Sequence, residues 1–399
     1  MSPVPGAADR PGVPGLLSDI VARIERDGPV PFDLFMDVAL YGERGGYYER
    51  GPAAIGPAGD FYTASEISSA FGTTLAKQIA ECAARLDEER LEIVELGAGR
   101  GTMASDILDT MLASHPALYK RLTYWIVDRS RGMREAQESL LAGHSGAGKV
   151  RWAVGPESVR PDGIVGCVIA NEFYDALPVR VVARREGALM ERCVGLVGDP
   201  RSLGWAERTA TAPELLEYAA RYGLAPADGT IAEAGLSARA YAGRVARAIR
   251  RGFQIVIDYG DRADRLYDPR VRPAGTLLGY RRHKVVDDPF SHVGEQDLTA
   301  HVNFSAIEDS GAGSDMESLG LTTQDRFLIS LGLADRIAEL AASTDPASIR
   351  RRLAMMALIH PEMMGRVFRV LVQAKGVAEK TITGLRDPFA RAVPAGGGK

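Results

Sequence analysis

The spacing of apolar residues along the chain changes close to residue 90. Before that point, apolar residues recur every three or four positions, which is the spacing of one buried helix face. This pattern predicts helices over 16–25, 32–41 and 67–86, separated by breaks rich in glycine, proline and aromatic residues. We therefore expect a helical and loop segment over 16–90. Residues 1–15 are rich in proline and glycine, and we expect them to form a disordered tail.

Beyond residue 90 the apolar residues gather into short runs, which predict β-strands. Five such runs lie at 91–96, 122–127, 150–154, 163–173 and 253–260. Helical patterns, such as those at 101–112 and 133–141, fill most of the intervals. Strands that alternate with helices form a mostly parallel sheet that is covered on both faces. The sequence therefore predicts an α/β fold, with its first four strands in a core at 91–178.

The fourth and fifth runs lie unusually far apart. The interval contains two strand-like runs and two helical ones, whereas a direct crossover needs far less chain. We therefore expect residues 179–250 to form an α+β insertion on the substrate side. Residues 251–376 are predicted to return to the core, with late strands inside 275–283 and 366–376 and a helical excursion at 322–343 between them. Residues 377–399 are predicted to be a C-terminal tail.

Composition and charge exclude several classes of protein. Hydrophobic residues make up 46% of the 399 residues and charged residues 25%, as in a globular enzyme. The net charge is 48 − 52 = −4, so nothing predicts a nucleic-acid partner. No apolar run is long enough to predict membrane insertion, and the N-terminus lacks the pattern of a signal or transit peptide. Three cysteines without a C-x-x-C spacing argue against disulfides, so we expect a cytoplasmic location.

The motif VELGAGRGT follows the first predicted strand. Gly97, Gly99 and Gly101 form a G-x-G-x-G turn, which lets a ligand approach the backbone at the start of a helix. The spacing differs from the dinucleotide fingerprint. Glu95 would repel a pyrophosphate but suits a cation, and S-adenosylmethionine carries a sulfonium and an ammonium without phosphate. Asp128, at the end of the second strand, is placed to bind ribose hydroxyls. The alternative is a tight turn in another kind of enzyme.

These motifs and others resemble those of the MidA-type methyltransferases. The stretches that carry the resemblance are FMDVALYGERGGYY, GDFYTASEIS, VELGAGRGTMASDIL, IANEFYDALPV, VIDYG, GTLLGYRRHKVVDDPFSHVGEQDLTAHVNFSAI and LTTQDRFL, and together they span about residues 16–375. Three residues depart from the family pattern. Ser65 stands where proline is usual. Asp128 stands where glutamate is usual, which keeps an acceptor for ribose, and Asn303 stands where aspartate is usual, which removes a charge.

The resemblance implies a seven-strand, Rossmann-like methyltransferase fold that uses S-adenosylmethionine. The cofactor of such folds lies across the carboxyl ends of the strands. Asn171 and Glu172 follow the fourth strand, so they would face the reactive methyl group. The resemblance also implies an arginine of a protein as methyl acceptor, with a subunit of respiratory complex I as one candidate. Arginine is always protonated in solution, so carboxylates would have to hold it.

Glu172 is the candidate for that clamp, through a bidentate pair with the guanidinium. Asp258, after the fifth strand, is a candidate catalytic carboxylate. Asp175 is a candidate for substrate binding, although a helix or turn cap explains it equally well.

Five other residues are candidates from loops and a late strand. Gly59 and Asp60 could close over the methionine end of the cofactor, or Asp60 could serve as a turn residue. Tyr280, Arg281 and His283 lie along a predicted strand, where alternate residues share a face. One face would line a substrate groove, and the alternative is a solvated edge strand.

Two further polar residues are interpreted as structural. Asp297 with Thr299 has the pattern of a turn or cap, and His301 that of a buried structural histidine. The six histidines do not pair at metal-ligand spacing, so we expect no metal site.

Two rival functions remain open from the sequence. The same cofactor chemistry could methylate a small molecule or a peptide natural product, in which case the insertion would shape a closed pocket. A cofactor-binding assembly factor without catalysis would show a degraded motif, whereas ELGAGRGT and NEF are intact. A homodimer is compatible with the sequence, which does not decide the oligomeric state.

Overall fold

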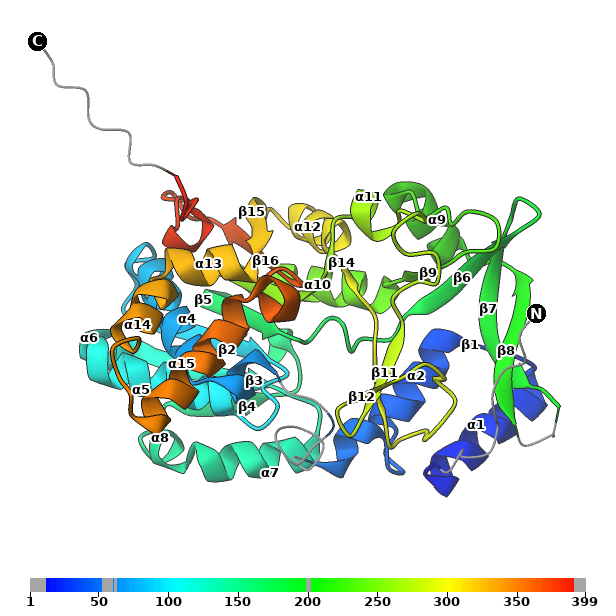
Figure 1. The fold of residues 1–399 in the computed structure, drawn as a ribbon, viewed down its shortest axis with the longest axis horizontal. Coiled ribbons are helices and arrows are strands. Elements are labelled where there is room, and N and C mark those ends of the chain that lie inside the picture. Colours follow the sequence, from blue (N-terminus) through cyan, green and yellow to red (C-terminus); the bar gives the residue numbers. More distant parts are fainter. Residues whose placement is uncertain (1–11, 52–59, 61–62, 199–201, 391–399) are drawn as a thin grey trace, which may run out of the picture.

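The computed structural model describes residues 12–51, 60, 63–198 and 202–390. The main sheet is built from β2 (Leu91–Leu96), β3 (Leu122–Val127), β4 (Val150–Ala153), β5 (Ile164–Asn171), β10 (Ile249–Asp261), β14 (Val302–Asn303), β15 (Glu317–Thr323) and β16 (Phe368–Lys375). Within the described residues its order is β15-β16-β10-β5-β2-β3-β4, and β14 pairs with β10 (Figure 1). Neighbours from β4 to β10 pair in parallel, whereas β16 is antiparallel to β10 and β15. The predicted α/β fold is confirmed: seven strands follow one another across the sheet, and β14 is a short eighth strand paired with β10.

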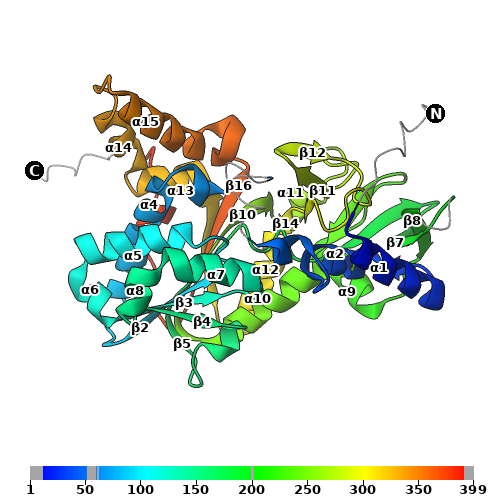
Figure 2. The same cartoon turned by 90° about the horizontal axis from the view of Figure 1, so that it is seen from below.

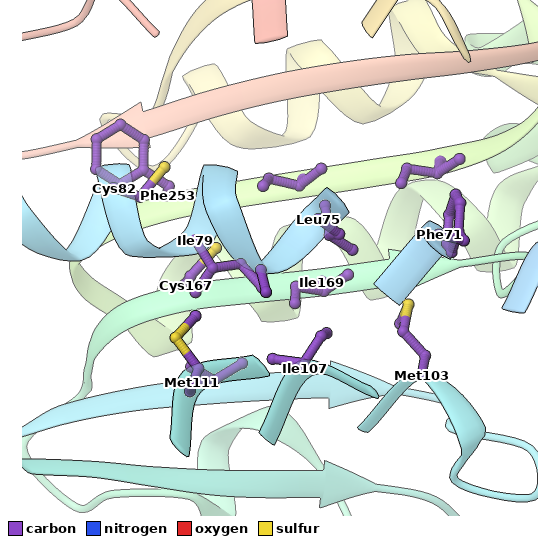
Figure 3. Close-up of a cluster of buried hydrophobic side chains, with 14 of the residues drawn as sticks. Phe71, Leu75, Ile79, Cys82, Met103, Ile107, Met111, Cys167, Ile169 and Phe253 are labelled. Carbon is purple, nitrogen blue, oxygen red and sulfur yellow. The ribbon is translucent and has the colours of Figure 1, made fainter. Parts of the chain in front are cut away.

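Helices cover both faces of this sheet because alternate side chains of a strand point to opposite faces. On one face, α4 (Ala70–Ala84) and α5 (Thr102–Ser114) pack over Ile169 of β5, as Figure 3 shows. On the other face, α10 (Leu236–Ala248) packs in one cluster with Val168 of the same strand. The free Cys82 and Cys167 are buried in the first of these clusters. The sheet is thus the centre of the core and holds its strand ends rigidly.

Short helices and turns complete the covering of the sheet. They are α3 (Ala64–Ile67), α6 (Pro116–Arg121), α7 (Arg131–Leu140), α8 (Ala142–Gly146), the 3-10 helix η3 (Pro156–Ser158), α11 (Ala263–Leu266) and α12 (Phe304–Ala312). Of these, α3 contacts α5, which follows the glycine turn. The N-terminal segment is therefore tied to the site through α3.

Residues 14–50, the first part of the N-terminal segment, and the insertion pack against each other at one end of the molecule, away from α4–α6 (Figure 2). This part contains α1 (Pro14–Asp27), β1 (Val30–Pro31), α2 (Phe32–Tyr41) and the 3-10 helix η1 (Tyr47–Arg50). The insertion contains β6 (Arg180–Arg185), β7 (Ala188–Leu196), β8 (Leu203–Thr209), α9 (Pro213–Tyr222) and β9 (Ile231–Ala234). Strand β1 pairs with β7 and joins the insertion sheet. Helix α1 begins at Pro14, inside the segment predicted to be a tail.

The later part of the chain departs most from the expected elements. It forms a small sheet of β11 (Leu278–Arg281), β12 (Lys284–Val286) and β13 (Asp297–Thr299), and then α13 (Gln324–Ser330), α14 (Leu333–Glu339), α15 (Pro346–Ile359), the π-helix η4 (Pro361–Gly365) and the 3-10 helix η5 (Thr383–Leu385). The prediction of a continuous helix at 322–343 is wrong. Its first residues end β15, and Gly332 divides the rest, since its φ of 89° ends α13 and starts α14. None of the described helices has the length and apolar character needed to cross a membrane.

Candidate functional site

A cavity of about 470 Å³ lies where the carboxyl ends of β2, β3 and β5 meet. Residues from the N-terminal segment, the core sheet and β11–β13 all line it, so distant parts of the chain build one site. Eight of the predicted site residues are in its wall: Glu95, Gly97, Gly99, Asp128, Asn171, Glu172, Asp175 and Tyr280. The sheet brings them together because parallel strands end at the same edge.

The glycine turn forms the floor of one half of the cavity. Gly97, Gly99 and Gly101 have φ values of 63°, 53° and 89°, which favour glycine over any other residue. A Cβ atom on Gly97 would lie 2.8 Å from the ring of Phe173. Gly101 is the N-cap of α5 and does not itself line the cavity. The turn therefore leaves backbone exposed to a ligand at the start of a helix.

Two acidic residues flank this turn. Glu95 is 2% exposed, and its Oε2 accepts a 2.6 Å hydrogen bond from the Tyr124 hydroxyl. Burial raises the pKa of Glu95 to about 7. The carboxylate of Asp128 accepts hydrogen bonds from the backbone N–H of Ser130 at 3.0 Å and the side chain of Gln137 at 2.9 Å. Both carboxylates are therefore fixed in place at the cavity wall.

Gln137 connects three parts of this half-site. Its buried amide nitrogen donates to Asp128 and to the carbonyl of Gly99 at 2.8 Å, and its oxygen accepts from the indole N–H of Trp152. Gln137 is not among the site residues predicted from the sequence. A signal existed, because Gln137 lies at four-residue spacing between Met133 and Leu141 on the apolar face of α7.

The other half of the cavity is acidic. Glu172 follows β5 with a φ of 49°, a strained value for a residue other than glycine. Its Oε1 accepts from the backbone N–H of Ala64 at 2.9 Å and from the Asn171 amide at 3.2 Å. Burial, and then the nearby charge of Asp175, raise the pKa of Glu172 to about 8. Among the described residues, no donor contacts the Oδ1 atom of buried Asn171.

Asp175 and Asp297 are the other carboxylates in this wall. Asp175 is 5% exposed, and burial raises its pKa well above the ordinary range, helped by the charges of Asp258 and Asp297. Asp297 is 3% exposed and accepts a 2.9 Å hydrogen bond from the Tyr48 hydroxyl. The interpretation of Asp297 as a turn or cap missed its place in the cavity. No local pattern revealed it, because the contact with Tyr48 spans 249 positions.

Asp258 lies behind the wall rather than in it. It is fully buried within β10, and its Oδ2 accepts hydrogen bonds from the backbone N–H groups of Phe173, Tyr174 and Asp175 at 3.2, 2.9 and 3.3 Å. Burial, and then the charge of Glu172, raise its pKa to about 8. This carboxylate holds the loop after β5 and has no access to an acceptor, which corrects its interpretation as a catalytic group.

Asp60 also lies outside the cavity lining. Its carboxylate accepts from the backbone N–H of Arg282 at 2.6 Å and from the Tyr47 hydroxyl at 3.1 Å, and its carbonyl accepts from the N–H of His283. Asp60 thus anchors the β11–β12 turn instead of contacting a cofactor. Gly59 lies outside the described residues.

The strand predicted inside 275–283 ends earlier than expected. Strand β11 stops at Arg281, and Arg282 and His283 have φ values of 50° and 58° that reverse the chain into β12. Tyr280 lines the cavity, whereas the Arg281 guanidinium lies 3.4 Å from the carboxylate of Glu295. Neither Arg281 nor His283 lines the cavity.

The side chains present fit S-adenosylmethionine. The open backbone of the glycine turn, the two flanking carboxylates and the unpartnered Oδ1 atom of Asn171 all meet the same cavity. Carboxylates are suited to an ammonium and to ribose hydroxyls, and the cofactor carries both groups. Glu95, Asp128, Asn171 and the turn backbone are therefore the groups that would hold it.

Comparison with known proteins decides the family. The model described as "Putative S-adenosyl-L-methionine-dependent methyltransferase" matches residues 74–322, more than half of the chain. The chain belongs to this family. The MidA-type resemblance is confirmed, and the protein is an S-adenosylmethionine-dependent methyltransferase.

Solved structures agree with this assignment. A crystal structure from Burkholderia thailandensis, described as a candidate methyl transferase, is bound to S-adenosyl-homocysteine. It is 33% identical, covers 98% of each chain and superposes with a TM-score of 0.84. A native structure from the same organism is 32% identical, with a TM-score of 0.79 and coverage of 97% of this chain and 98% of the other.

Curated relatives include the mitochondrial protein arginine methyltransferase NDUFAF7. The Danio rerio protein is 29% identical over 89% of this chain and 85% of its own length. The Homo sapiens protein is 27% identical over 90% of this chain and 83% of its own. These relatives are mitochondrial by name, which contradicts the cytoplasmic location expected from cysteine usage and the N-terminus. Sparse cysteines indicate a reducing environment and do not specify a compartment.

Proposed function

We propose that this methyltransferase transfers the methyl group to a guanidinium nitrogen of an arginine in a protein. The observation that carries the proposal is the set of carboxylates in the acceptor half of the cavity: Glu172, Asp175 and Asp297. No arginine, lysine or histidine of the described residues forms an ion pair with any of them. Enclosed carboxylates that lack a cationic partner are costly to ionise, so this wall is suited to a cationic ligand.

The form of the cluster favours a broad cation over a metal ion. In the described part of the chain, no three His, Cys, Asp or Glu side chains are grouped as metal ligands. A guanidinium is planar and presents five N–H donors, which separate carboxylates can bind at once. Tyr41 and Tyr48 stack with ring centroids 5.3 Å apart beside the cluster, and the guanidinium of Arg129 already lies over the Tyr41 ring, 4.3 Å from its centroid.

The protein's contribution to the reaction is alignment and proton acceptance. The bound cofactor supplies an electrophilic methyl group. Glu172 has Oε1 fixed by Ala64 and Asn171, while no described residue donates to Oε2. This free oxygen can orient the acceptor nitrogen and take the proton that the nitrogen releases on methylation. The raised pKa of Glu172, about 8, suits that role close to neutral pH.

The relatives named as protein arginine methyltransferases support the same acceptor. The proposal is tested by incubating the protein with methyl-labelled S-adenosylmethionine and a lysate of its own cells, and then mapping label by mass spectrometry. We expect label on arginine of one or a few proteins, and Glu172→Gln should keep cofactor binding and lose transfer. Label confined to small molecules, or normal turnover by Glu172→Gln, would contradict the proposal.

A further inference from the structure

Asp297 enters the cavity from a different element than Glu172. Strand β13 carries it, and Asp297 pairs across the ladder with Tyr280 of β11, which also lines the cavity. Thr299, two positions further on, shares the face of Asp297 and lines the cavity as well. Strands β11 and β13 of the small sheet thus line the cavity side by side, whereas Glu172 directly follows β5.

In the described part of the chain, every hydrogen bond to the Asp297 carboxylate falls on one oxygen. Oδ1 accepts from the Tyr48 hydroxyl at 2.9 Å and from the backbone N–H of Leu298 at 3.0 Å. No described residue donates a hydrogen bond to Oδ2. Two donors on a single oxygen fix the rotation of the carboxylate and leave the second oxygen available to a ligand.

A purely structural role leaves part of this arrangement unexplained. A buried carboxylate that only held Tyr48 would be expected to have both oxygens satisfied or a cation beside it. Asp297 is only 3% exposed, yet among the described residues its Oδ2 has no donor and its carboxylate has no cation beside it. Burial raises the pKa of Asp297 to about 7, and a bound cation would favour its ionised form.

We propose that Asp297 is the second carboxylate of the guanidinium clamp, that its Oδ2 binds a nitrogen that Glu172 does not bind, and that Tyr48 is the positioning residue that orients it. The inference rests on the proposed function, since it assumes a guanidinium acceptor. Two carboxylates from two walls fix the plane of the acceptor as well as its position. A lysine ammonium offers no such planar fork, so Asp297 favours arginine over lysine.

The test uses four variants of the full chain. Asp297→Asn removes the charge and keeps the shape, Asp297→Glu restores a carboxylate, and Tyr48→Phe removes only the orienting hydroxyl. Asp287→Asn is the matched control, because Asp287 is exposed, follows β12 and does not line the cavity. The probes are S-adenosyl-homocysteine alone and N-acetyl-arginine amide in its presence, with affinities measured by titration calorimetry. Steady-state kinetics on an arginine peptide accompany them.

We expect Asp297→Asn to weaken binding of the arginine probe by roughly 10- to 100-fold, the range for a hydrogen bond to a charged group. Tyr48→Phe should raise KM for the peptide more than it lowers kcat, and Asp297→Glu should recover part of the affinity. Binding of S-adenosyl-homocysteine should stay within about two-fold in all four variants, because no proposed contact with the cofactor is removed.

The outcomes separate this inference from the proposed function. If the wild-type protein neither binds the arginine probe nor methylates arginine, the proposed function is wrong and the inference falls with it. If the wild-type protein does both and Asp297→Asn binds the probe as tightly as Asp287→Asn does, only the inference is overturned. If Asp297→Asn fails to fold, Tyr48→Phe decides, since an unchanged KM in that variant contradicts the orienting role.

Discussion

The side-chain amide of Gln137 donates a 2.9 Å hydrogen bond to the carboxylate of Asp128. The same nitrogen donates to the carbonyl of Gly99, so one residue of α7 fixes both the glycine turn and the acidic residue after β3. In the proposed binding mode these groups hold different parts of the cofactor. Their relative position therefore depends on a residue that does not line the cavity.

We predict that Gln137→Leu weakens binding of S-adenosyl-homocysteine by roughly ten-fold, the equivalent of a lost hydrogen bond of about 1.4 kcal/mol. The variant loses both hydrogen bonds that the amide nitrogen donates, so the turn and Asp128 are no longer fixed relative to each other. Titration calorimetry measures the effect. Glu138→Ala is the control, since Glu138 is exposed on the same helix and forms an exposed ion pair with Arg134. Equal affinities in the two variants would contradict a positioning role for Gln137.

Asp258 gives a second prediction, about stability as well as activity. Asp258→Asn replaces a carboxylate that accepts from four backbone N–H groups, three on Oδ2 and that of Tyr259 on Oδ1, by an amide whose nitrogen cannot accept. We expect the free energy of unfolding to fall by about 1–3 kcal/mol, and kcat/KM to fall because the loop carrying Glu172 loosens. Urea unfolding and steady-state kinetics measure both. Exposed Asp264, changed to asparagine, should alter neither quantity.

If Asp258 acts only by holding the loop, the free energy of unfolding and kcat/KM fall together in its variant. A variant as stable as the wild type, with activity lost, would instead restore Asp258 as a group that contacts the acceptor.

The core of the fold follows from local pattern, whereas the acceptor site does not. The apolar runs at 91–96 and 122–127 coincide with β2 and β3, since period and burial are local properties. The glycine turn and Glu172 were recognisable for the same reason, because each directly follows such a strand. Asp297 meets Tyr48 only after the chain has folded, and its neighbours in sequence carry no sign of that contact.

The misassigned elements have equally specific causes. Strand β15 has no fully buried residue and only two large apolar residues, Leu319 and Leu321, so its apolar run was too short to predict a strand. Arg282 and His283 adopt positive φ values without being glycine, and hydrogen bonds to Asp60 stabilise that turn from 222 positions away. In both cases tertiary contacts outweighed local preference.

The acidic acceptor wall predicts a rising pH profile. Burial raises the pKa of Glu172 to about 8 and of Asp297 to about 7, while the acceptor guanidinium stays protonated throughout. The clamp needs ionised carboxylates, so kcat/KM should rise between pH 6 and about 8.5 and then level off. Asp175 and Asp258 share this electrostatic environment, so the apparent values belong to the cluster. Kinetics on an arginine peptide at constant ionic strength measure the profile, and a flat profile over this range would contradict the clamp.

Asp297 also links the site to stability in the absence of ligand. Its folded pKa of about 7 lies above the ordinary value of 3.8, so the folded state favours the protonated form. Protonated Asp297 therefore adds to the free energy of unfolding below pH 3.8, and this contribution is lost as the pH rises to 7. Asparagine at position 297 keeps the shape of the side chain and cannot ionise, so only the wild type loses stability as the pH rises. The free energy of unfolding of Asp297→Asn minus that of the wild type should therefore increase from pH 4.5 to pH 7 and then stay constant. Urea unfolding without ligand measures this difference. The Asp287→Asn curve should run parallel to wild type, and a parallel Asp297→Asn curve would show that Asp297 is not held in a low-dielectric wall.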